Sequence, residues 1–427
     1  PGVPDSLKAL AKSGPQESDL KPQLLSYYLQ SVCQTTSKDF VDMRKSMEQY
    51  NQQKTALENL IPSTFIYRDL PSPRESFVMM RGAYNKPGDK VEPGVFAFLP
   101  PLQKANEQGP ASRLDLAKWL VSENHPLTAR VTVNRFWQQF FGTGLVKSSY
   151  DFGSQGELPS HPELLDWLAV NFIASGWDQK QLVRLIVNSA AFRRDSRIES
   201  EVLSRDPENR FYARGPRFRL DAEQIRDNAL QLSGLLIGKM GGKGVKPYQP
   251  ANIWEPVGFT GSNTQVYRQD SGEALYRRSI YTFLKRTAPP PFMSNFDGPN
   301  REQFCTRRER SNTPLQALQL MNDVQHIEAA RGFAQRMLLE GGSSSDQRIT
   351  FAFREILARN PQPDELTIVV AELDKHLERY RHDTDAAMKL ITHGESKPAA
   401  NINGSELAAY TLIANMMLNL DETLTRN

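Results

Sequence analysis

The sequence contains very little cysteine. Only Cys33 and Cys305 occur among 427 residues, so the chain can build neither a disulfide framework nor a four-cysteine zinc site. It has no Cys-x-x-Cys-His motif, which excludes covalent haem attachment to this chain. Its six histidines show no His-Glu-x-x-His spacing. We therefore expect the chain itself to bind no metal ion and no cofactor.

Long apolar runs and a strong net charge are also absent. No apolar run approaches the ~18 residues that cross a bilayer, so we expect no membrane span. Lysine plus arginine exceed aspartate plus glutamate by 52 to 49, a net charge of +3, and we expect no binding of nucleic acid. Hydrophobic residues nevertheless make up 39% of the chain, which is enough to form a folded core.

Motifs for nucleophilic catalysis and phosphate binding are missing as well. Residues 153–156 read Gly-Ser-Gln-Gly rather than a Gly-x-Ser-x-Gly elbow, and Lys243 is followed by glycine, unlike a phosphate-binding loop. Cys305 lies between Arg301 and Arg307, which would favour a thiolate, although packing as a small hydrophobic residue is the alternative. The motifs therefore identify no reaction, and whether the chain is an enzyme stays open.

Apolar residues three and four positions apart predict a mainly α protein with a multi-helix core and a small β-element. Residues 1–61 are predicted to form a helical hairpin. Its first apolar stripe begins at Leu20, and its second runs from Phe40 to Ile61 with coiled-coil spacing. Residues 62–110 favour a small β-element or linker, with extended runs at 65–67, 77–80 and 95–99.

The remaining chain is predicted to be helical in two parts. Residues 111–342 form the main helical domain and residues 343–427 a C-terminal helical subdomain. Within the main domain, residues 235–312 are irregular and rich in proline, glycine and aromatic residues, with one predicted strand at 279–285. Irregular segments of this length in compact domains are usually functional or disordered, and the aromatic content argues against disorder.

Two helix starts in the main domain carry capping signals. Asn124 is a predicted N-cap, and Ser160 with Glu163 is a predicted capping box. The helix that follows Asn124 presents a polar stripe opposite its apolar face, made of Arg130, Asn134 and Gln138.

Two histidines and two carboxylates are weak candidate catalytic residues. His125 and His161 precede prolines at these helix starts, where the helix dipole favours a neutral imidazole that can act as ligand or base. Asp151 and Glu157 flank a glycine-rich turn and are candidates for the carboxylate pair of a glycoside hydrolase. Each of the four also has a structural interpretation, in helix capping or turn formation.

One segment carries most of the positive charge. Between residues 277 and 310, eight basic residues face three acids, a local balance of +5. Guanidinium groups bind sulfate, phosphate or carboxylate through paired hydrogen bonds, so the segment is a candidate anion-binding surface. The alternative is that these arginines pair with acids elsewhere, as expected for residues 206–227, where five arginines meet five acids. The candidate anion-binding residues are Arg277, Arg278, Arg286, Arg301, Arg307, Arg308 and Arg310.

Several long strings resemble a single family. They include NHPLTARVTVNRFW at 124–137, DFGSQG at 151–156, SHPELLDWL at 160–168 and NTPLQAL at 312–318. The family is the planctomycete-specific domain of unknown function, of the PSD type, which usually follows a planctomycete cytochrome c domain. The resemblance covers about residues 62–425.

The resemblance implies a C-terminal binding or docking module of an extracytoplasmic, haem-associated protein, in the periplasm or at the cell surface. Haem c is expected on an N-terminal domain or a partner chain. The implied partners are a cytochrome c domain or chain, an anionic polysaccharide and a sulfatase-like companion protein. The alternative is an enzyme, either a hydrolase of glycan breakdown or a haem-dependent oxidoreductase. No catalytic residue carries over from the family, and a Cys33–Cys305 disulfide is not expected.

Overall fold

The computed structural model describes residues 8, 22, 24–33, 37–61, 63–70 and 74–426. Contacts divide the chain into two compact units, Pro1–Arg68 and Asp69–Asn427. The predicted start of the first apolar stripe, Leu20, lies outside the described residues. Within them, the predicted mainly α fold is confirmed, and no helix is long and apolar enough to cross a membrane.

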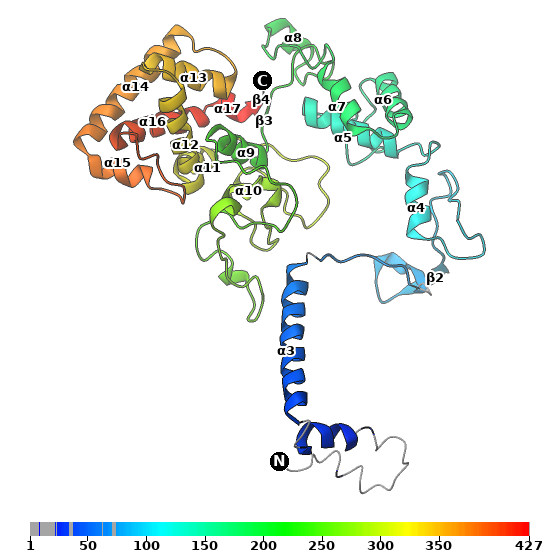
Figure 1. Ribbon diagram of the computed structural model, residues 1–427. Coiled ribbons are helices and arrows are strands. Elements are labelled where there is room, and N and C mark those ends of the chain that lie inside the picture. The colour runs from blue at the N-terminus through cyan, green and yellow to red at the C-terminus, as the bar shows by residue number, and fades with distance from the viewer. Residues whose placement is uncertain are drawn as a thin grey trace. The chain divides into compact units, whose positions relative to one another are not determined.

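The first unit is built on one long helix. The π-helical turn η1, Tyr28–Val32, precedes helix α3, Ser37–Leu60 (Figure 1). The apolar residues of the predicted seam lie on this helix with their side chains exposed; Met47 is 64% exposed and Leu57 63%. Pairing of this seam with another helix stays a prediction.

The second unit opens with a β-hairpin. Strand β1, Ser76–Met79, pairs antiparallel with strand β2, Pro87–Val91, and the 3-10 turn η2, Met80–Gly82, follows β1 directly. Of the three predicted extended runs, only 77–80 contributes a strand. The prediction is wrong for 65–67 and 95–99, whose aromatic side chains Phe65, Phe96 and Phe98 are exposed and offer no packed face to stabilise a ladder.

A first group of helices follows the hairpin and forms its own core (Figure 1). The side chain of Asn134 on α5 holds the segment that follows this helix. It accepts from the amide of Val146 at 2.9 Å and donates to the carbonyl of the same residue at 3.0 Å. The helices are α4 (Arg113–Leu120), α5 (Thr128–Phe141), α6 (Pro162–Ala174), α7 (Gln179–Val187) and α8 (Ser200–Arg205). The core residues include Val133, Trp137, Leu165, Leu168, Phe172 and Ile186.

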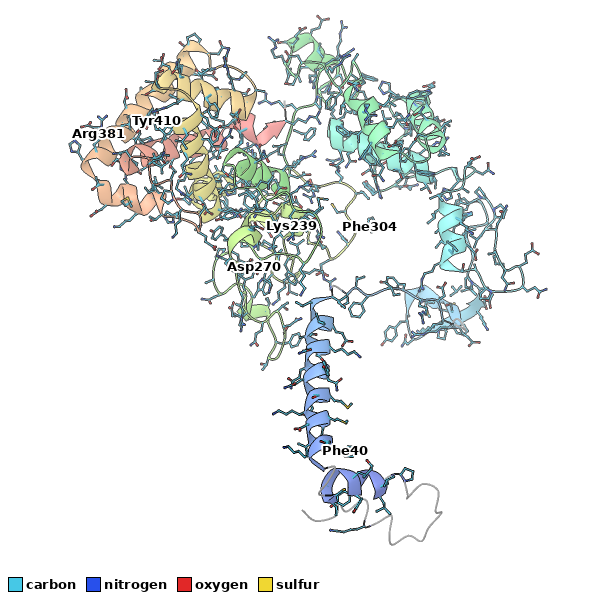
Figure 2. All side chains as sticks on the ribbon, in the orientation of Figure 1. Phe40, Lys239, Asp270, Phe304, Arg381 and Tyr410 are labelled. Atoms are coloured by element: carbon cyan, nitrogen blue, oxygen red, sulfur yellow. The ribbon has the colours of Figure 1, made fainter. Side chains whose placement is uncertain are left out.

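A second group of helices packs around α16, whose Tyr410 is only 1% exposed (Figures 1 and 2). Helices α12 and α16 share one hydrophobic core with part of α9. This core therefore contains residues from both sides of the predicted boundary at residue 342. The two-stranded sheet of β3 (Phe218–Arg219) and β4 (Thr425–Arg426) brings the last residues back beside α9. The helices are α9 (Ala222–Leu232), α10 (Pro291–Asn295), α11 (Pro314–Asn322), α12 (Val324–Glu340), α13 (Ser345–Leu357), α14 (Pro363–His382), α15 (Thr384–Ile391), α16 (Gly404–Leu418) and α17 (Asp421–Leu424).

The irregular segment 235–312 contains short helical turns, α10 and two isolated parallel β-bridges, which join Ile237 to Arg277 and Val245 to Thr282. Its turns are η3 (Glu255–Val257), η4 (Gly272–Tyr276) and η5 (Ser279–Tyr281). The predicted strand at 279–285 is therefore wrong. The amide of Ser279 donates to the Asp227 carboxylate at 2.7 Å and so binds this part of the backbone to α9, while the β-type pairing of residues 281–283 is limited to one bridge with Val245.

One buried arginine on α9 fixes this segment. Arg226 is 2% exposed, and its guanidinium donates to the carbonyl of Leu275 at 2.7 Å and to the carbonyl of Arg277 at 2.8 Å. It also donates to the side chains of Ser279 and Gln325. Burial lowers the pKa of Arg226 to about 10, so the group still carries its charge at neutral pH.

Replacement of Arg226 by methionine tests this role. The variant keeps most of the side-chain volume but leaves two buried carbonyls without a donor, and we expect the free energy of unfolding to fall by at least about 2 kcal/mol. The measurement is urea denaturation followed by tryptophan fluorescence, to which Trp254, buried within the segment, contributes. The control is Arg278→Met, an exposed arginine of the same segment, which should change stability by less than about 0.5 kcal/mol. Equal stability of both variants would contradict the role of Arg226.

Candidate anion-binding cleft

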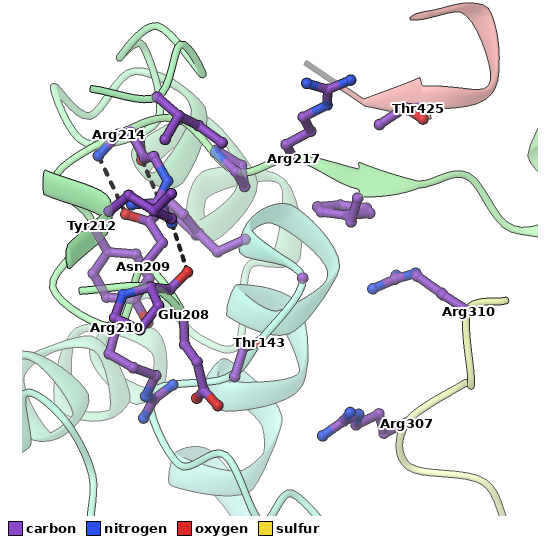
Figure 3. Close-up of a pocket in the computed structure, with 18 of the residues that line it drawn as sticks. Thr143, Glu208, Asn209, Arg210, Tyr212, Arg214, Arg217, Arg307, Arg310 and Thr425 are labelled. Carbon is purple, nitrogen blue, oxygen red and sulfur yellow. Dashed lines mark hydrogen bonds between the residues drawn. The ribbon is translucent and has the colours of Figure 1, made fainter. Parts of the chain in front are cut away.

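A cleft of about 680 Å³ lies where three distant parts of the second unit meet. One wall is the end of α5 and the segment 207–218, the opposite wall is the loop 307–310, and the third side is formed by Asp421 and Thr425 near the C-terminal end (Figure 3). Figure 3 shows Arg307 and Arg310 extending from their loop toward the wall that bears Thr143 and Glu208.

The residues that line the cleft carry an excess of positive charge. Six of them are arginines and three are carboxylates, which leaves three positive charges in excess. Two of the carboxylates have close partners: Glu208 lies 2.8 Å from Lys147, and Asp421 lies 2.8 Å from Arg217. The six arginines are Arg210, Arg214, Arg217, Arg307, Arg308 and Arg310.

Two of these arginines donate to backbone carbonyls, which bring no negative charge to the cleft. Arg210 donates to the carbonyls of Gly144 and Leu145, and Arg214 donates to those of Asp206 and Pro207. Backbone carbonyls satisfy guanidinium donors without neutralising the charge. The prediction for residues 206–227 rested on equal numbers of arginines and acids, and such a count does not reveal hydrogen bonds to backbone carbonyls. It therefore missed Arg210, Arg214 and Arg217 as cleft residues.

Arg310 lies in a site that disfavours its own charge. Its guanidinium is 4.3 Å from the centre of the Phe218 ring, and its closest carboxylate oxygen, on Asp221, is 3.7 Å away. Burial lowers the pKa of Arg310, and the nearby charges of Arg307 and Arg308 lower it further, against the effect of Asp221. A bound anion would relieve this crowding of positive charge.

Arg307 and Arg308 are neighbours with opposite roles. Arg308 donates to both carboxylate oxygens of Glu223 on α9, an ion pair whose two side chains are about three-quarters buried. Burial alone would raise the pKa of Glu223, but the hydrogen bonds and charge of Arg308 bring it below its ordinary value. Arg307 is exposed, and within the described part of the chain it has no ion-pair partner within 4.0 Å.

The other predicted anion-binding arginines lie outside the cleft. Arg277 is buried, donates to the carbonyls of Lys239, Gly241 and Lys243, and lies over the Tyr281 ring at 3.7 Å. Three others lie nearer to solvent. Arg278 and Arg301 line a separate cavity of about 830 Å³, and Arg286 is 3.8 Å from Glu302.

The loop that carries Arg307 also presents apolar surface. Phe304 is 83% exposed on this loop (Figure 2), and Cys305 is exposed beside it. The Cys305 thiol donates to the carbonyl of Arg307 at 3.1 Å. Cys33 and Cys305 are not bonded to each other, as predicted.

The candidate catalytic residues have structural partners and do not line the cleft. The N-cap residue of α5 is Leu127, which makes no side-chain cap bond, so the cap predicted at Asn124 is wrong; the Nδ1 of His125 accepts from the amide of Thr128 at 3.2 Å. His161 is the N-cap residue of α6 but makes no side-chain cap bond, and its Nδ1 lies 3.0 Å from the hydroxyl of Ser160. The capping box predicted there is therefore absent.

The candidate carboxylates lie at their turn. Asp151 accepts from the amide of Gly153 at 2.7 Å, and the Glu157 amide donates to the hydroxyl of Ser148 at 2.8 Å. Gly156 fits there only without a side chain, since a Cβ would lie 2.1 Å from the Asp151 carbonyl oxygen. Among the described residues, no group of three histidine, cysteine, aspartate or glutamate side chains is placed to hold a metal ion.

The predicted polar stripe of α5 connects parts of the fold. Arg130 pairs with Asp166 on α6 at 2.7 Å, and Asn134 holds the backbone of Val146. Gln138 donates to the carbonyl of Thr306 at 3.0 Å and so attaches α5 to the loop that carries Arg307. The stripe therefore positions the cleft wall.

The contrast between Arg307 and Arg308 can be measured directly. We expect Arg308→Gln to lower the free energy of unfolding by about 1.5–3 kcal/mol at pH 7, because it leaves Glu223 partly buried and unpaired. Arg307→Gln should change it by less than about 0.5 kcal/mol. Thermal unfolding at matched pH compares the two variants.

The pH dependence of the Arg308 effect has a definite sign. The folded-state pKa of Glu223 is lowered, so the ion pair contributes fully above the ordinary carboxyl pKa of about 4.3 and this contribution is lost as pH falls through the folded-state value. The stability difference between the original chain and Arg308→Gln should therefore shrink below pH 4. A difference that is constant down to pH 3 would contradict this assignment.

Comparison with known proteins gives a family and no activity. The family described as PSD1, protein of unknown function (DUF1553), matches residues 112–373, which include the arginines of both cleft walls. No curated protein and no solved structure matches the chain. The match spans more than half of the sequence, and the chain therefore belongs to the PSD1 family of proteins of unknown function.

Proposed function

We propose that the chain is a non-catalytic binding module that holds an anionic polymer in the cleft. The observation that carries this proposal is the excess of three positive charges among the lining residues, with Arg307 and Arg310 directed into the space. Guanidinium groups form paired, charge-assisted hydrogen bonds with sulfate and carboxylate groups. An anion with repeated charges would contact arginines from both walls.

The shape of the site favours a polysaccharide as the anionic partner. A cleft of about 680 Å³ is of the size that encloses a small ligand or a short length of polymer. The acidic face of a folded cytochrome domain would lie across the rim and leave the floor unfilled. We therefore place a sulfated or carboxylated polysaccharide first.

The setting of this function rests on sequence resemblance. We propose that the chain works outside the cytoplasm, beside a haem-bearing cytochrome c domain or chain and a sulfatase-like companion protein. In that setting the module would bring the haem-bearing part to an anionic glycan.

The arrangement of carboxylates supports binding over hydrolysis. Asp151 and Glu157 lie outside the cleft, and two of its three lining carboxylates, Glu208 and Asp421, each pair with a basic residue. A general acid needs a carboxyl group with a raised pKa, whereas the pKa of Glu208 is lowered by its hydrogen bond and charge interaction with Lys147.

Binding of dextran sulfate, compared with uncharged dextran of the same length, tests the proposal. We expect saturable binding of dextran sulfate alone, weakening with added salt because ions screen exposed charges. Arg307→Gln with Arg310→Gln should raise the Kd about tenfold, which corresponds to about 1.4 kcal/mol. The measurement is isothermal titration calorimetry at several salt concentrations.

The matched control is Arg278→Gln with Arg286→Gln, which removes two exposed positive charges outside the cleft and should leave the Kd within about twofold. Thermal unfolding of each variant confirms that the fold is kept. Equal weakening by the control and the cleft variants would show nonspecific charge attraction and overturn the proposed site. Binding of an acidic cytochrome c, with no binding of dextran sulfate, would replace the polysaccharide by a protein partner.

A further inference from the structure

Helix α3 presents a regular apolar seam that the described residues leave uncovered. Met43, Met47 and Leu57 are each 63–64% exposed, and Tyr50 is 70% exposed. One polar residue, Lys54, interrupts the seam. The apolar positions, spaced alternately three and four apart, are Phe40, Met43, Met47, Tyr50, Leu57 and Ile61.

The spacing indicates what kind of surface covers the seam. When apolar residues repeat every seven positions, the apolar face of a helix packs along its length against a second helix with the same repeat. The side chains of the two helices then interlock. Covering the seam removes its apolar side chains from water, and packing of such a face is the main source of helix stability in proteins. The described helical residues 24–32 span about 14 Å, against about 36 Å for α3, and cannot cover it alone.

We propose that two copies of this chain associate through α3 and that the two helices run antiparallel. Lysine at a core position selects this orientation. A parallel, in-register pair would place Lys54 against Lys54 of the second copy, two like charges in an apolar seam. An antiparallel pair centred on residue 52 places Lys54 against the Tyr50 ring of the second copy instead.

The antiparallel register satisfies the rest of the seam as well. It places Met47 opposite Leu57 and Met43 opposite Ile61, so these four apolar side chains meet in pairs, while Phe40 falls opposite Thr64, beyond the end of α3. The ammonium group of Lys54 can lie over the face of the Tyr50 ring, where a cation is attracted by the ring electrons. Lys54 Nζ is also 3.8 Å from Glu58 of its own helix, which offsets part of its charge.

The association is independent of the proposed function, because α3 lies in the first unit and the cleft lies in the second. It would place two clefts in one particle. A polymer that reaches both would be held by two sites at once, which raises apparent affinity without a new contact.

Sedimentation equilibrium of the full chain tests the association. We expect a reversible dimer at micromolar to millimolar concentration. Met47→Glu places a charge in the seam and should weaken the dimer at least tenfold. The control Gln52→Glu adds the same charge on the opposite face of α3 and should leave the dimer unchanged. A chain that stays monomeric throughout, or equal effects of both variants, overturns the proposal.

Disulfide trapping tests the orientation. In a background of Cys33→Ser and Cys305→Ser, chains with Met47→Cys are mixed with chains with Leu57→Cys and oxidised. The antiparallel pair predicts a mixed disulfide between the two variants, identified by mass, and no disulfide between two Met47→Cys chains. Disulfides only between identical variants would show a parallel pair and overturn the orientation. Circular dichroism and the thermal transition confirm that each variant is folded.

Discussion

The buried guanidinium of Arg226 is the interaction on which the irregular segment 235–312 depends. A charged group can be buried when its polar atoms are hydrogen-bonded. The guanidinium of Arg226 donates to the carbonyls of Leu275 and Arg277 and to two polar side chains. The same contacts give the carbonyls of Leu275 and Arg277 a hydrogen-bond donor. A long segment with little secondary structure is thereby held in one conformation.

Helix α9 attaches the middle of this segment and its C-terminal end through three nearby side chains. Arg226 and Asp227 bind the backbone at 275–279, while Glu223, one turn earlier, binds Arg308. The loop between these attachments is free to present Arg307 and Phe304 to solvent. Two adjacent residues therefore have different roles. Arg308 fixes the loop through its ion pair, and Arg307 faces the cleft.

Local sequence patterns predicted the helices well and their tertiary partners poorly. The three-and-four spacing of apolar residues reports one buried face, which is a property of the helix itself, so the mainly α fold followed from it. The pairing of Arg308 with Glu223 joins positions 85 residues apart, and no local pattern encodes it. The same limit explains why the charge count at 277–310 grouped the buried Arg277 with the exposed Arg307.

Cap predictions failed where a competing group was closer. Asn124 has the side chain of a good N-cap, but α5 begins only at Thr128, and the imidazole of His125 accepts from the amide of that residue instead. At α6, the hydroxyl of Ser160 lies near His161 Nδ1 and makes no capping bond to the helix. The prolines shifted each helix start beyond the residue that composition alone favoured.

The cleft depends on more of the chain than the family match covers. The matched residues 112–373 supply all six arginines, but Asp421 and Thr425 complete the site from the C-terminal end. These residues are placed by β4, which pairs with β3, and by Arg426, which donates to the carbonyl of Phe140 at the end of α5. Because Asp421 also pairs with Arg217, the C-terminal end both closes the cleft and reduces its positive charge. A relative that kept the arginines and lacked an acid at this position would present a more open and more positive site, so ligand preference within the family can change without any change in the arginines.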